Sequence, residues 1–268
     1  MGKTIPSITL SGNYGLLQQP PWNGAMPYQH LFYPESNFGG YTDIDGTITF
    51  YNRVNTLVQS DSVILDIGCG RGQYAEDEIS WRRHLRIMKG KCQKVIGIDV
   101  NPAAQNNPFL DEFWLIPADY HFPVPNESID LALADWVLEH VQDPALFFAE
   151  CRRAIKPDGF LCIRTINVWG YAGLLARLIP NRFHARILGK AQRNKKEEDT
   201  FPTVYRCNTI GKIKEMMENY GLDSCVYGYE SEPQYCAFSK VLYRLAVWHQ
   251  KLAPKGLKTA IFAFGKKR

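Results

Sequence analysis

The stretch Val63-Ile-Leu-Asp-Ile-Gly-Cys-Gly-Arg-Gly72 constrains the fold of this chain more than any other part of the sequence. It opens with a short apolar run, which is typical of a strand buried on both faces. Asp66 follows, then three glycines at alternate positions, Gly68, Gly70 and Gly72, and then polar residues compatible with a helix. A strand that ends in glycines and leads into a helix brings bare backbone amides against a ligand. The pattern therefore predicts a site for a ligand with a ribose or an anionic end.

Strand-like and helix-like segments alternate after this stretch. We expect further strands over 94–99, 113–119, 129–134 and 160–166, with a helix over 144–155, and a helix over 47–58 ahead of the first strand. Strands separated by helices form a parallel sheet through right-handed crossovers, and ligands bind outside the carboxyl ends of its strands. Four acids fall at the expected strand ends and so at one edge of the sheet: Asp66, Asp99, Asp119 and Asp135.

Composition narrows the class of protein. The 268 residues are 45% hydrophobic with no low-complexity tract, as in an ordinary globular protein. A net charge of +4, dispersed along the chain, does not favour nucleic acid as a partner. Seven cysteines without a Cys-x-x-Cys pair indicate reduced structural thiols and no metal site. No apolar run approaches the roughly 18 residues that span a bilayer, so we expect a soluble, cytoplasmic protein without a transmembrane segment.

The successive motifs resemble those of a known family. VILDIGCGRG, VIGIDVNP, IPADYHFPVPNESID, LADWVLEHVQDP and RRAIKPDGF are closely similar to the motifs of class I S-adenosylmethionine-dependent methyltransferases, above all the group that includes the ubiquinone-biosynthesis type. The similarity covers about residues 60–166, in the family's order. It implies an α/β fold with a Rossmann-like, doubly wound, seven-stranded, mostly parallel sheet. The last strand would be antiparallel, with 222–230 and 259–265 as the final two strands.

The resemblance also implies the cofactor and its contacts. S-adenosyl-L-methionine would be bound, S-adenosyl-L-homocysteine would be the product, and no metal is implied. Asp66 would hold the methionyl ammonium as an anion facing a cation, and Asp99 would accept the ribose hydroxyls. The remaining positions implied to line the cofactor are Gly68, Cys69, Gly70 and Gly72 in the loop, Val100 beside the ribose, Asp119 and Tyr120 at the adenine, and Asp135 and Trp136 beside the sulfonium.

Two other classes of protein compete with this interpretation. A nicotinamide-dependent oxidoreductase also places glycines after a first strand and an acid after a second. However, Gly68-x-Gly70-x-Gly72 lacks the Gly-x-Gly-x-x-Gly step, and Asp66 would face and repel the pyrophosphate. A non-catalytic protein that only binds S-adenosylmethionine is the second alternative, although no motif here has visibly lost its chemistry.

Candidates for catalysis are His140 and Asp135, which follow the fourth expected strand. Histidine exchanges a proton near neutral pH and could deprotonate a hydroxyl acceptor. A capping or packing role for His140 is an equal alternative. The basic insert Trp81-Arg-Arg-His-Leu-Arg86 lengthens the connection between the first two strands. We interpret it as surface elaboration, with contact to a substrate as the alternative.

The chain divides into an N-terminal arm, 1–45, and a methyltransferase domain, 46–268. That domain carries a helical cap insert, 167–202, and a second helical insert, 232–256. The cap is far longer than a usual connection, and two interpretations compete. It either covers the acceptor pocket, which we favour, or lies as an amphipathic surface on a membrane or partner. The sequence leaves peripheral membrane contact and the oligomeric state open.

Residues in and after the cap carry the acceptor hypothesis. The candidate substrate contacts are Trp169, His184, Tyr205 and Arg206. The runs RLIPNRFH and EEDTFP resemble, more loosely, the caps of bacterial methyltransferases associated with surface glycans. This resemblance implies a small-molecule or glycan acceptor, with O-methylation of a sugar hydroxyl as our first expectation. A small aromatic or lipid-like metabolite is the second.

Overall fold

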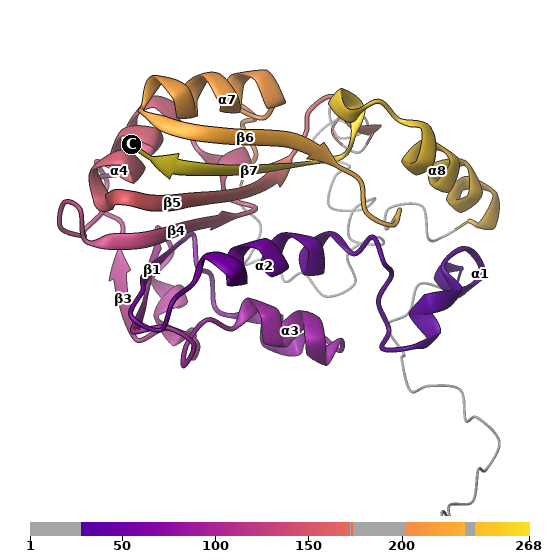
Figure 1. Ribbon diagram of the computed structural model, residues 1–268, viewed down its shortest axis with the longest axis horizontal. Coiled ribbons are helices and arrows are strands. Elements are labelled where there is room, and N and C mark those ends of the chain that lie inside the picture. The colour runs from indigo at the N-terminus through magenta and orange to yellow at the C-terminus, as the bar shows by residue number, and fades with distance from the viewer. Residues whose placement is uncertain (1–27, 172, 174–201, 234–238) are drawn as a thin grey trace, which may run out of the picture.

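The computed structural model describes residues 28–171, 173, 202–233 and 239–268 (Figure 1). Its centre is a seven-stranded sheet with the strand order β3-β2-β1-β4-β5-β7-β6. The strands β3, β2, β1, β4 and β5 pair in parallel, whereas β7 runs antiparallel to both β5 and β6. The predicted α/β fold, with a mostly parallel sheet and a reversed last strand, is confirmed.

The described elements follow one another in the order that alternating segments predicted. They are α1 Gln29–Phe32, η1 Pro34–Asn37, α2 Gly46–Leu57, β1 Val63–Ile67, η2 Gln73–Glu76, α3 Ser80–Arg86, β2 Lys94–Asp99, η3 Pro102–Asn106, β3 Glu112–Leu115, β4 Ile129–Asp135, η4 Leu138–His140, α4 Pro144–Ala154, β5 Ile155–Ile166, α7 Ile210–Asn219, β6 Leu222–Tyr229, α8 Lys240–Leu252, η7 Lys255–Leu257 and β7 Ala260–Lys267.

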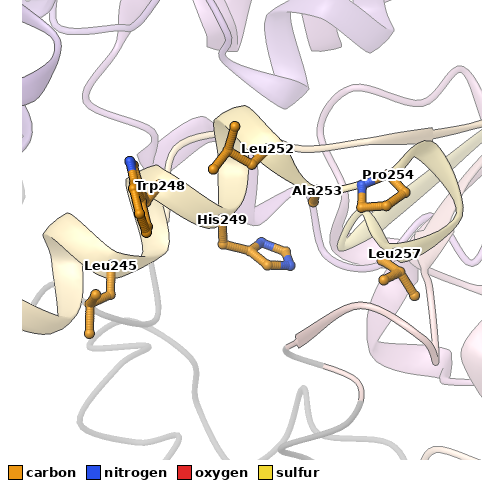
Figure 2. A pocket seen from close by; sticks show the side chains of 7 residues that line it. All are labelled: Leu245, Trp248, His249, Leu252, Ala253, Pro254 and Leu257. Atoms are coloured by element: carbon orange, nitrogen blue, oxygen red, sulfur yellow. The ribbon is translucent and has the colours of Figure 1, made fainter.

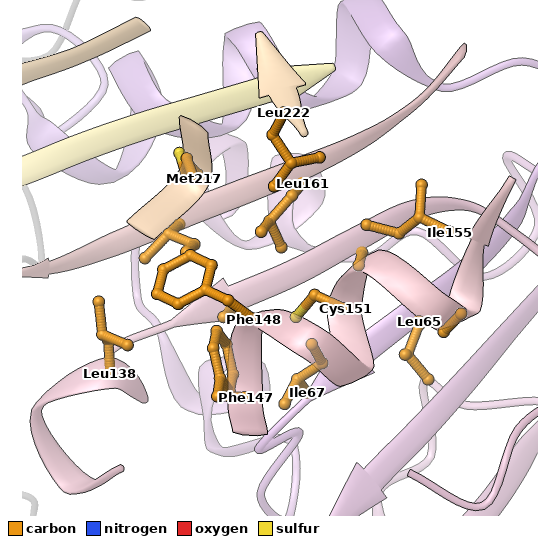
Figure 3. Close-up of a cluster of buried hydrophobic side chains, with 14 of the residues drawn as sticks. Leu65, Ile67, Leu138, Phe147, Phe148, Cys151, Ile155, Leu161, Met217 and Leu222 are labelled. Carbon is orange, nitrogen blue, oxygen red and sulfur yellow. The ribbon is translucent and has the colours of Figure 1, made fainter. Parts of the chain in front are cut away.

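Helices cover both faces of the sheet. On one face, Phe148 of α4 and Met217 of α7 pack on the buried side chains of β1, β4 and β5 (Figure 3). On the other face, Phe50 of α2 and Leu85 of α3 belong to a second apolar cluster against the same strands. Because β1 is sandwiched between two layers, its carboxyl end is held rigidly, and the loop that follows it starts from a defined position.

Two strand boundaries differ from the expected ones by more than two residues, and the others agree more closely. β3 ends at Leu115, four residues before Asp119, because Pro117 has no N–H to donate to a strand ladder. β5 begins at Ile155, although 156–159 was expected to be a turn. Ile155 pairs with Ile129, and the register then shifts before Leu131 pairs with Phe160. Residues 156–159 are therefore accommodated within the strand by a bulge-like irregularity.

The site edge of the sheet is where β1, β2, β4, β5 and β6 all end. Helix α8 leaves this edge after β6 and returns to it at the start of β7, so it lies beyond the strand ends (Figure 1). Tyr243 and Val247 of α8 pack against Tyr33, with Tyr28 and Phe32 at the periphery of this small cluster.

Several predicted segments fall wholly or partly outside the described residues. These are residues 1–27 of the N-terminal arm and most of the cap insert 167–202, including His184. The second insert, 232–256, contains α8. None of the helices in the described ranges is long and apolar enough to cross a membrane.

Candidate functional site

The glycine loop after β1 is held against the end of β2. The Gly68 and Cys69 amides donate to the Ile98 carbonyl at 2.7 and 3.3 Å. Gly68 has a φ of +64°, and a Cβ there would lie 2.6 Å from the Val137 side chain. Gly70 also has a positive φ, +55°, but apart from its two chain neighbours no atom of the described chain lies within 4 Å of where its Cβ would be. Gly70 therefore faces open space, from which a ligand can approach the backbone.

The rest of the loop is shaped by Asn107, a residue that sequence reasoning missed. Its Nδ2 donates to the Cys69 and Gly70 carbonyls at 3.1 and 3.2 Å. A Cβ on Gly72 would lie 2.6 Å from the Asn107 Oδ1, so Gly72 is needed for close packing. The Cys69 side chain is only 7% exposed, and burial raises the pKa of its thiol far above the usual range. Cys69 and Gly72 can therefore offer a ligand mainly their backbone.

Asp99 ends β2 and is buried directly beneath the loop. Its Oδ2 accepts from the Gly70 amide at 2.9 Å, and its Oδ1 accepts from the Asn101 amide at 2.8 Å. These two bonds fix the carboxylate, and each oxygen retains capacity to accept another hydrogen bond. A vicinal diol, such as that of a ribose, could donate to both oxygens at once. The following residue, Val100, is 47% exposed at the same edge.

Asp66 lies within β1, next to the loop and close to other acids. Burial raises the pKa of Asp66 to about 7, and the Asp135 and Asp99 carboxylates raise it as well, whereas Arg86 lowers it. A buried acid that loses its proton only near pH 7 is poorly stabilised in its ionised form. A cation that binds beside it therefore stabilises the carboxylate more than it would stabilise an exposed one. This position can therefore hold an ammonium group, and that cation would keep Asp66 ionised.

Asp135, at the end of β4, is held in an ion pair with Arg164 of β5. The Arg164 Nε and Nη2 donate to its two oxygens at 2.6 and 2.7 Å, and the Tyr51 hydroxyl donates to Oδ2 at 2.9 Å. Burial by itself raises the pKa of Asp135, but the Arg164 guanidinium outweighs it and holds the pKa below the usual range. A carboxylate this acidic, with both oxygens engaged, is a poor proton acceptor. Its geometry suits a positioning role, not the catalytic one expected from sequence.

Trp136 follows this ion pair in a left-handed conformation. Its φ is +60°, its amide donates to the Arg164 carbonyl at 2.8 Å, and its ring lies 5.2 Å from the Arg164 guanidinium carbon. The side chain is 41% exposed at the site edge. A bulky residue at positive φ persists only where its surroundings hold it there. The Asp135–Arg164 pair therefore positions an exposed indole beside the carboxyl end of β4.

The basic insert reaches the site edge, which favours the alternative of contact with a ligand over surface elaboration. Arg86, the last residue of α3, has its guanidinium carbon 4.6 Å from the Tyr74 ring centroid and 5.7 Å from that of Tyr51. Its Nη2 lies 3.6 Å from Asp135 Oδ2. Its Nε is buried and has no hydrogen-bond partner among the residues described. A buried, unpaired N–H on a cation is unfavourable without a ligand, so Arg86 is suited to hold an anionic group.

Asp119 and Tyr120 lie farther along this edge and are exposed. Asp119 Oδ1 accepts from the His121 amide at 3.1 Å. Tyr120 has a φ of +60° and is 53% exposed. Because β3 ends at Leu115, both residues belong to a loop beyond the strand, where an aromatic ring and a carboxylate are accessible to a base.

His140 ends η4 and contacts the segment that follows the cap. Its Nδ1 lies 2.9 Å from the Pro202 carbonyl, and the Val204 and Tyr205 amides donate to the Glu139 carbonyl at 2.8 and 3.2 Å. A histidine whose Nδ1 donates to a carbonyl uses Nε2 as its proton acceptor. This arrangement is compatible with a general base at His140.

The other candidate acceptor residues come from segments joined to this turn. Glu139 Oε2 accepts from the Thr165 hydroxyl at 2.8 Å, and that hydroxyl accepts from Asn208 Nδ2 at 2.6 Å. Asn208 is thereby buried with its Nδ2 engaged, whereas its Oδ1 has no hydrogen-bond partner among the described residues. The network ties η4 to the end of β5 and to the 202–208 segment. Those two segments carry Trp169, which is 51% exposed, half-buried Tyr205 at a φ of +51°, and exposed Arg206.

Arg164 and Arg86 were not singled out from sequence, but Arg164 left a signal. It interrupts the apolar run Phe160-Leu-Cys-Ile-Arg-Thr-Ile166, and a guanidinium inside a buried strand needs a carboxylate partner. Arg86 left none, because a helix of seven residues with three arginines is typical of a solvated surface. In the described part of the chain, no group of His, Cys, Asp and Glu side chains could hold a metal ion.

A parallel sheet whose first strand ends in a glycine loop, with a buried carboxylate closing the second, defines a nucleoside-cofactor-binding α/β domain. Comparison with known proteins extends this assignment. Residues 65–163 match the family described as "Methyltransferase domain". The chain is 32% identical over 106 residues to a ubiquinone biosynthesis O-methyltransferase of Neisseria meningitidis, covering 39% of this chain and 44% of the relative. It is 27% identical over 108 residues to a malonyl-[acyl-carrier protein] O-methyltransferase of Hahella chejuensis, covering 38% and 36% of the two chains.

Solved structures agree on the fold. An S-adenosylmethionine-dependent methyltransferase from Archaeoglobus fulgidus superimposes with a TM-score of 0.51 and 18% identity, covering 90% of this chain and all of that one. The chain spans less than half the length of the curated relatives it matches first. The matched region is a class I S-adenosylmethionine-dependent methyltransferase domain, an enzyme domain whose cofactor is S-adenosylmethionine.

The residues present fit this cofactor. Asp99 has acceptor capacity for a diol directly beside the open space at Gly70. Asp66 offers a carboxylate to an ammonium, and Arg86 offers an unpaired N–H to a carboxylate. The zwitterionic amino acid end of the cofactor and its ribose thus each have complementary groups along the same edge of the sheet.

Proposed function

We propose that the chain catalyses methyl transfer from S-adenosylmethionine to a hydroxyl oxygen of a small-molecule acceptor, a sugar hydroxyl first. The observation that carries methyl transfer is the Asp99 carboxylate, fixed by the Gly70 amide beside an open glycine position. Oxygen as the accepting atom is supported by two relatives that are named O-methyltransferases.

In this proposal each end of the cofactor has its own residues. Asp99 accepts the ribose hydroxyls, Asp119 and Tyr120 border the adenine, and Asp66 holds the methionyl ammonium. Arg86 binds the methionyl carboxylate through its unpaired Nε. The cofactor supplies an electrophilic methyl group on a sulfonium. The protein then needs to align an acceptor oxygen, exclude water and remove a proton.

Arg86→Gln is expected to weaken S-adenosylhomocysteine binding by about 10- to 100-fold, since a hydrogen bond to a charged group contributes about 1.5–3 kcal/mol. Binding of 5′-methylthioadenosine, which lacks the amino acid end, should remain unchanged. Titration calorimetry with both ligands measures the difference. The matched control is Arg83→Gln on the same helix, whose guanidinium donates to the Asp77 carbonyl. Equal losses for the two ligands would refute the carboxylate contact.

The acceptor is proposed to lie between the exposed indoles of Trp136 and Trp169, which offer flat apolar surfaces to a ring. Tyr205 and Arg206 supply hydrogen-bonding groups for hydroxyls. His140 would take the hydroxyl proton through Nε2, oriented by the Nδ1 contact with the Pro202 carbonyl. A small aromatic hydroxyl fits the same flat surfaces and is the second candidate.

His140→Gln is expected to lower kcat by about 100- to 10,000-fold, the usual contribution of a general base. S-adenosylhomocysteine affinity should not change, because His140 is not among the groups proposed to hold the cofactor. Production of S-adenosylhomocysteine with monosaccharides and with catechol measures turnover and separates the two acceptor classes. The wild-type rate should rise as the histidine deprotonates, and this rise should vanish in the variant. His84→Gln, an exposed histidine on α3, is the control. An unchanged pH profile would leave His140 a packing residue.

A further inference from the structure

Helix α8 is apolar on the face that points away from the protein. Val241, Leu245, Trp248 and Leu252 recur at intervals of four, three and four residues and so form one stripe along the helix. Their side chains are 69%, 55%, 67% and 67% exposed. The opposite face, with Tyr243, Ala246 and Val247, is the buried one. A surface helix normally turns charged residues to solvent, and here the outer face is apolar instead.

The stripe continues onto the turn that follows the helix. Figure 2 shows Leu245, Trp248 and Leu252 on α8, with Pro254 and Leu257 beyond its end. Together with their neighbours, these side chains line a shallow hollow of about 340 Å³. Leu257 is itself 45% exposed. Single exposed apolar residues are common on protein surfaces, but a continuous apolar surface over two elements is not.

The charged residues on α8 and on the turn that follows it are all basic, and the nearest acid, Glu230, is buried beside Lys258 and His249. Lys240, Arg244 and Lys251 lie on α8, all three on one flank of the apolar stripe, and Lys255 and Lys258 follow. None of the five takes part in an ion pair within the described residues. The sequence from Pro233 to Arg268 contains no Asp or Glu. The face therefore combines exposed leucines and a tryptophan with unneutralised positive charge.

We propose that the outer face of α8 docks on a membrane surface that contains anionic phospholipid. An amphipathic helix with Trp and Leu on one side and only Lys and Arg beside them is the arrangement that lies in the lipid interface. Lipid phosphates would supply counter-charges to these basic residues, none of which forms an ion pair within the described chain, although Lys258 lies near the buried Glu230 carboxylate. A second copy of this chain fits less well, since it would bring only like charges toward this flank.

The position of α8 connects this surface to the site. The helix lies beyond the carboxyl ends of the strands, the edge that carries Asp99 and Trp136 (Figure 1). Docking would therefore bring that edge toward the bilayer. The inference goes beyond the proposed function, because vesicle binding requires neither cofactor nor acceptor and can be measured without turnover.

The experiment is co-sedimentation of the full chain with two kinds of vesicle, phosphatidylcholine alone and phosphatidylcholine containing phosphatidylglycerol. We expect binding to the anionic vesicles, weakening as salt is raised. The variant Leu245→Gln/Trp248→Gln/Leu252→Gln should reduce the affinity for anionic vesicles at least about tenfold, since buried apolar area drives interfacial binding. The variant Lys240→Gln/Arg244→Gln/Lys251→Gln should lose the preference for the anionic vesicles.

Trp81→Gln is the matched control, because Trp81 is 46% exposed on α3 and should bind vesicles as the wild type does. Unchanged S-adenosylhomocysteine affinity in each variant shows that the fold is intact. The proposal would be overturned if the wild-type protein bound neither kind of vesicle. It would also be overturned if the Leu245, Trp248 and Leu252 variant bound anionic vesicles as tightly as the wild type does. A dimer found by light scattering without lipid, and lost in that variant, would assign the face to self-association instead.

Discussion

Asp99→Ala is expected to weaken S-adenosylhomocysteine binding by two to four orders of magnitude. The substitution removes two acceptor oxygens for the ribose, each charged hydrogen bond contributing about 1.5–3 kcal/mol. It also releases the Gly70 amide, which Asp99 Oδ2 holds at 2.9 Å. Titration calorimetry measures the affinity, and a thermal melt separates a lost contact from a lost fold.

Two variants make this result interpretable. Asp158→Ala removes an exposed acid at the far end of β5, where it pairs with Lys266, and should leave binding unchanged. Asp99→Asn keeps one acceptor oxygen but turns an NH₂ group toward a backbone amide. Its affinity should therefore lie below that of the wild type and at or above that of Asp99→Ala. Wild-type affinity in Asp99→Ala would remove the assignment of the ribose to this carboxylate, and with it the cofactor pose.

Arg164→Gln is expected to destabilise the fold by about 3–5 kcal/mol, the usual cost of breaking a buried ion pair from one side. The variant leaves Asp135 buried with only the Tyr51 hydroxyl at 2.9 Å and Arg86 at 3.6 Å. Denaturant unfolding measures the change. The exposed pair Lys212–Glu215 provides the control, and Lys212→Gln should change stability little. Similar losses in the two variants would contradict a special role for the buried pair.

The pH dependence of this loss follows from the pKa of Asp135. The folded pKa is lowered relative to the unfolded chain, so the ion pair stabilises the fold fully above the unfolded value of about 4. That contribution disappears as the pH falls through the folded value. In Arg164→Gln, a protonated Asp135 is tolerated more easily than an ionised one. The stability difference between wild type and variant should therefore be largest near neutral pH and should narrow below about pH 4.

Much of the fold was predictable because its signals are local. Gly68 and Gly70 each have a positive φ, a local conformation that favours glycine. The strands β1, β2 and β4 can be recognised from the length and composition of their apolar runs. The predicted start of β5 was wrong because a distant partner decides it. β5 begins at Ile155 because that residue pairs with Ile129 across a register shift, which no feature of 156–159 reveals.

The site divides in the same way. The proposed cofactor contacts of Asp66 and Asp99 could be inferred from the sequence, because each residue has a fixed place relative to a strand end. The role expected for Asp135 changed, because its partner Arg164 comes from the neighbouring strand and Tyr51 from a helix 84 residues earlier. Arg86 and Asn107 reach the loop only through the packing of α3 and η3 on the sheet edge.

The sequence alone determined the order of the strands along the chain, the glycine loop and the acid at the end of β2. Each of these features depends on the residue types at neighbouring positions. Only the tertiary structure decided how the charges are partnered and which apolar faces stay outside. Within the described residues, Arg164 is neutralised and Arg86 Nε stays without a hydrogen-bond partner, because both outcomes depend on distances between elements far apart in the chain. Helix α8 has apolar residues on two sides, and docking against Tyr33 and Phe32 buried one of them and left Trp248 exposed.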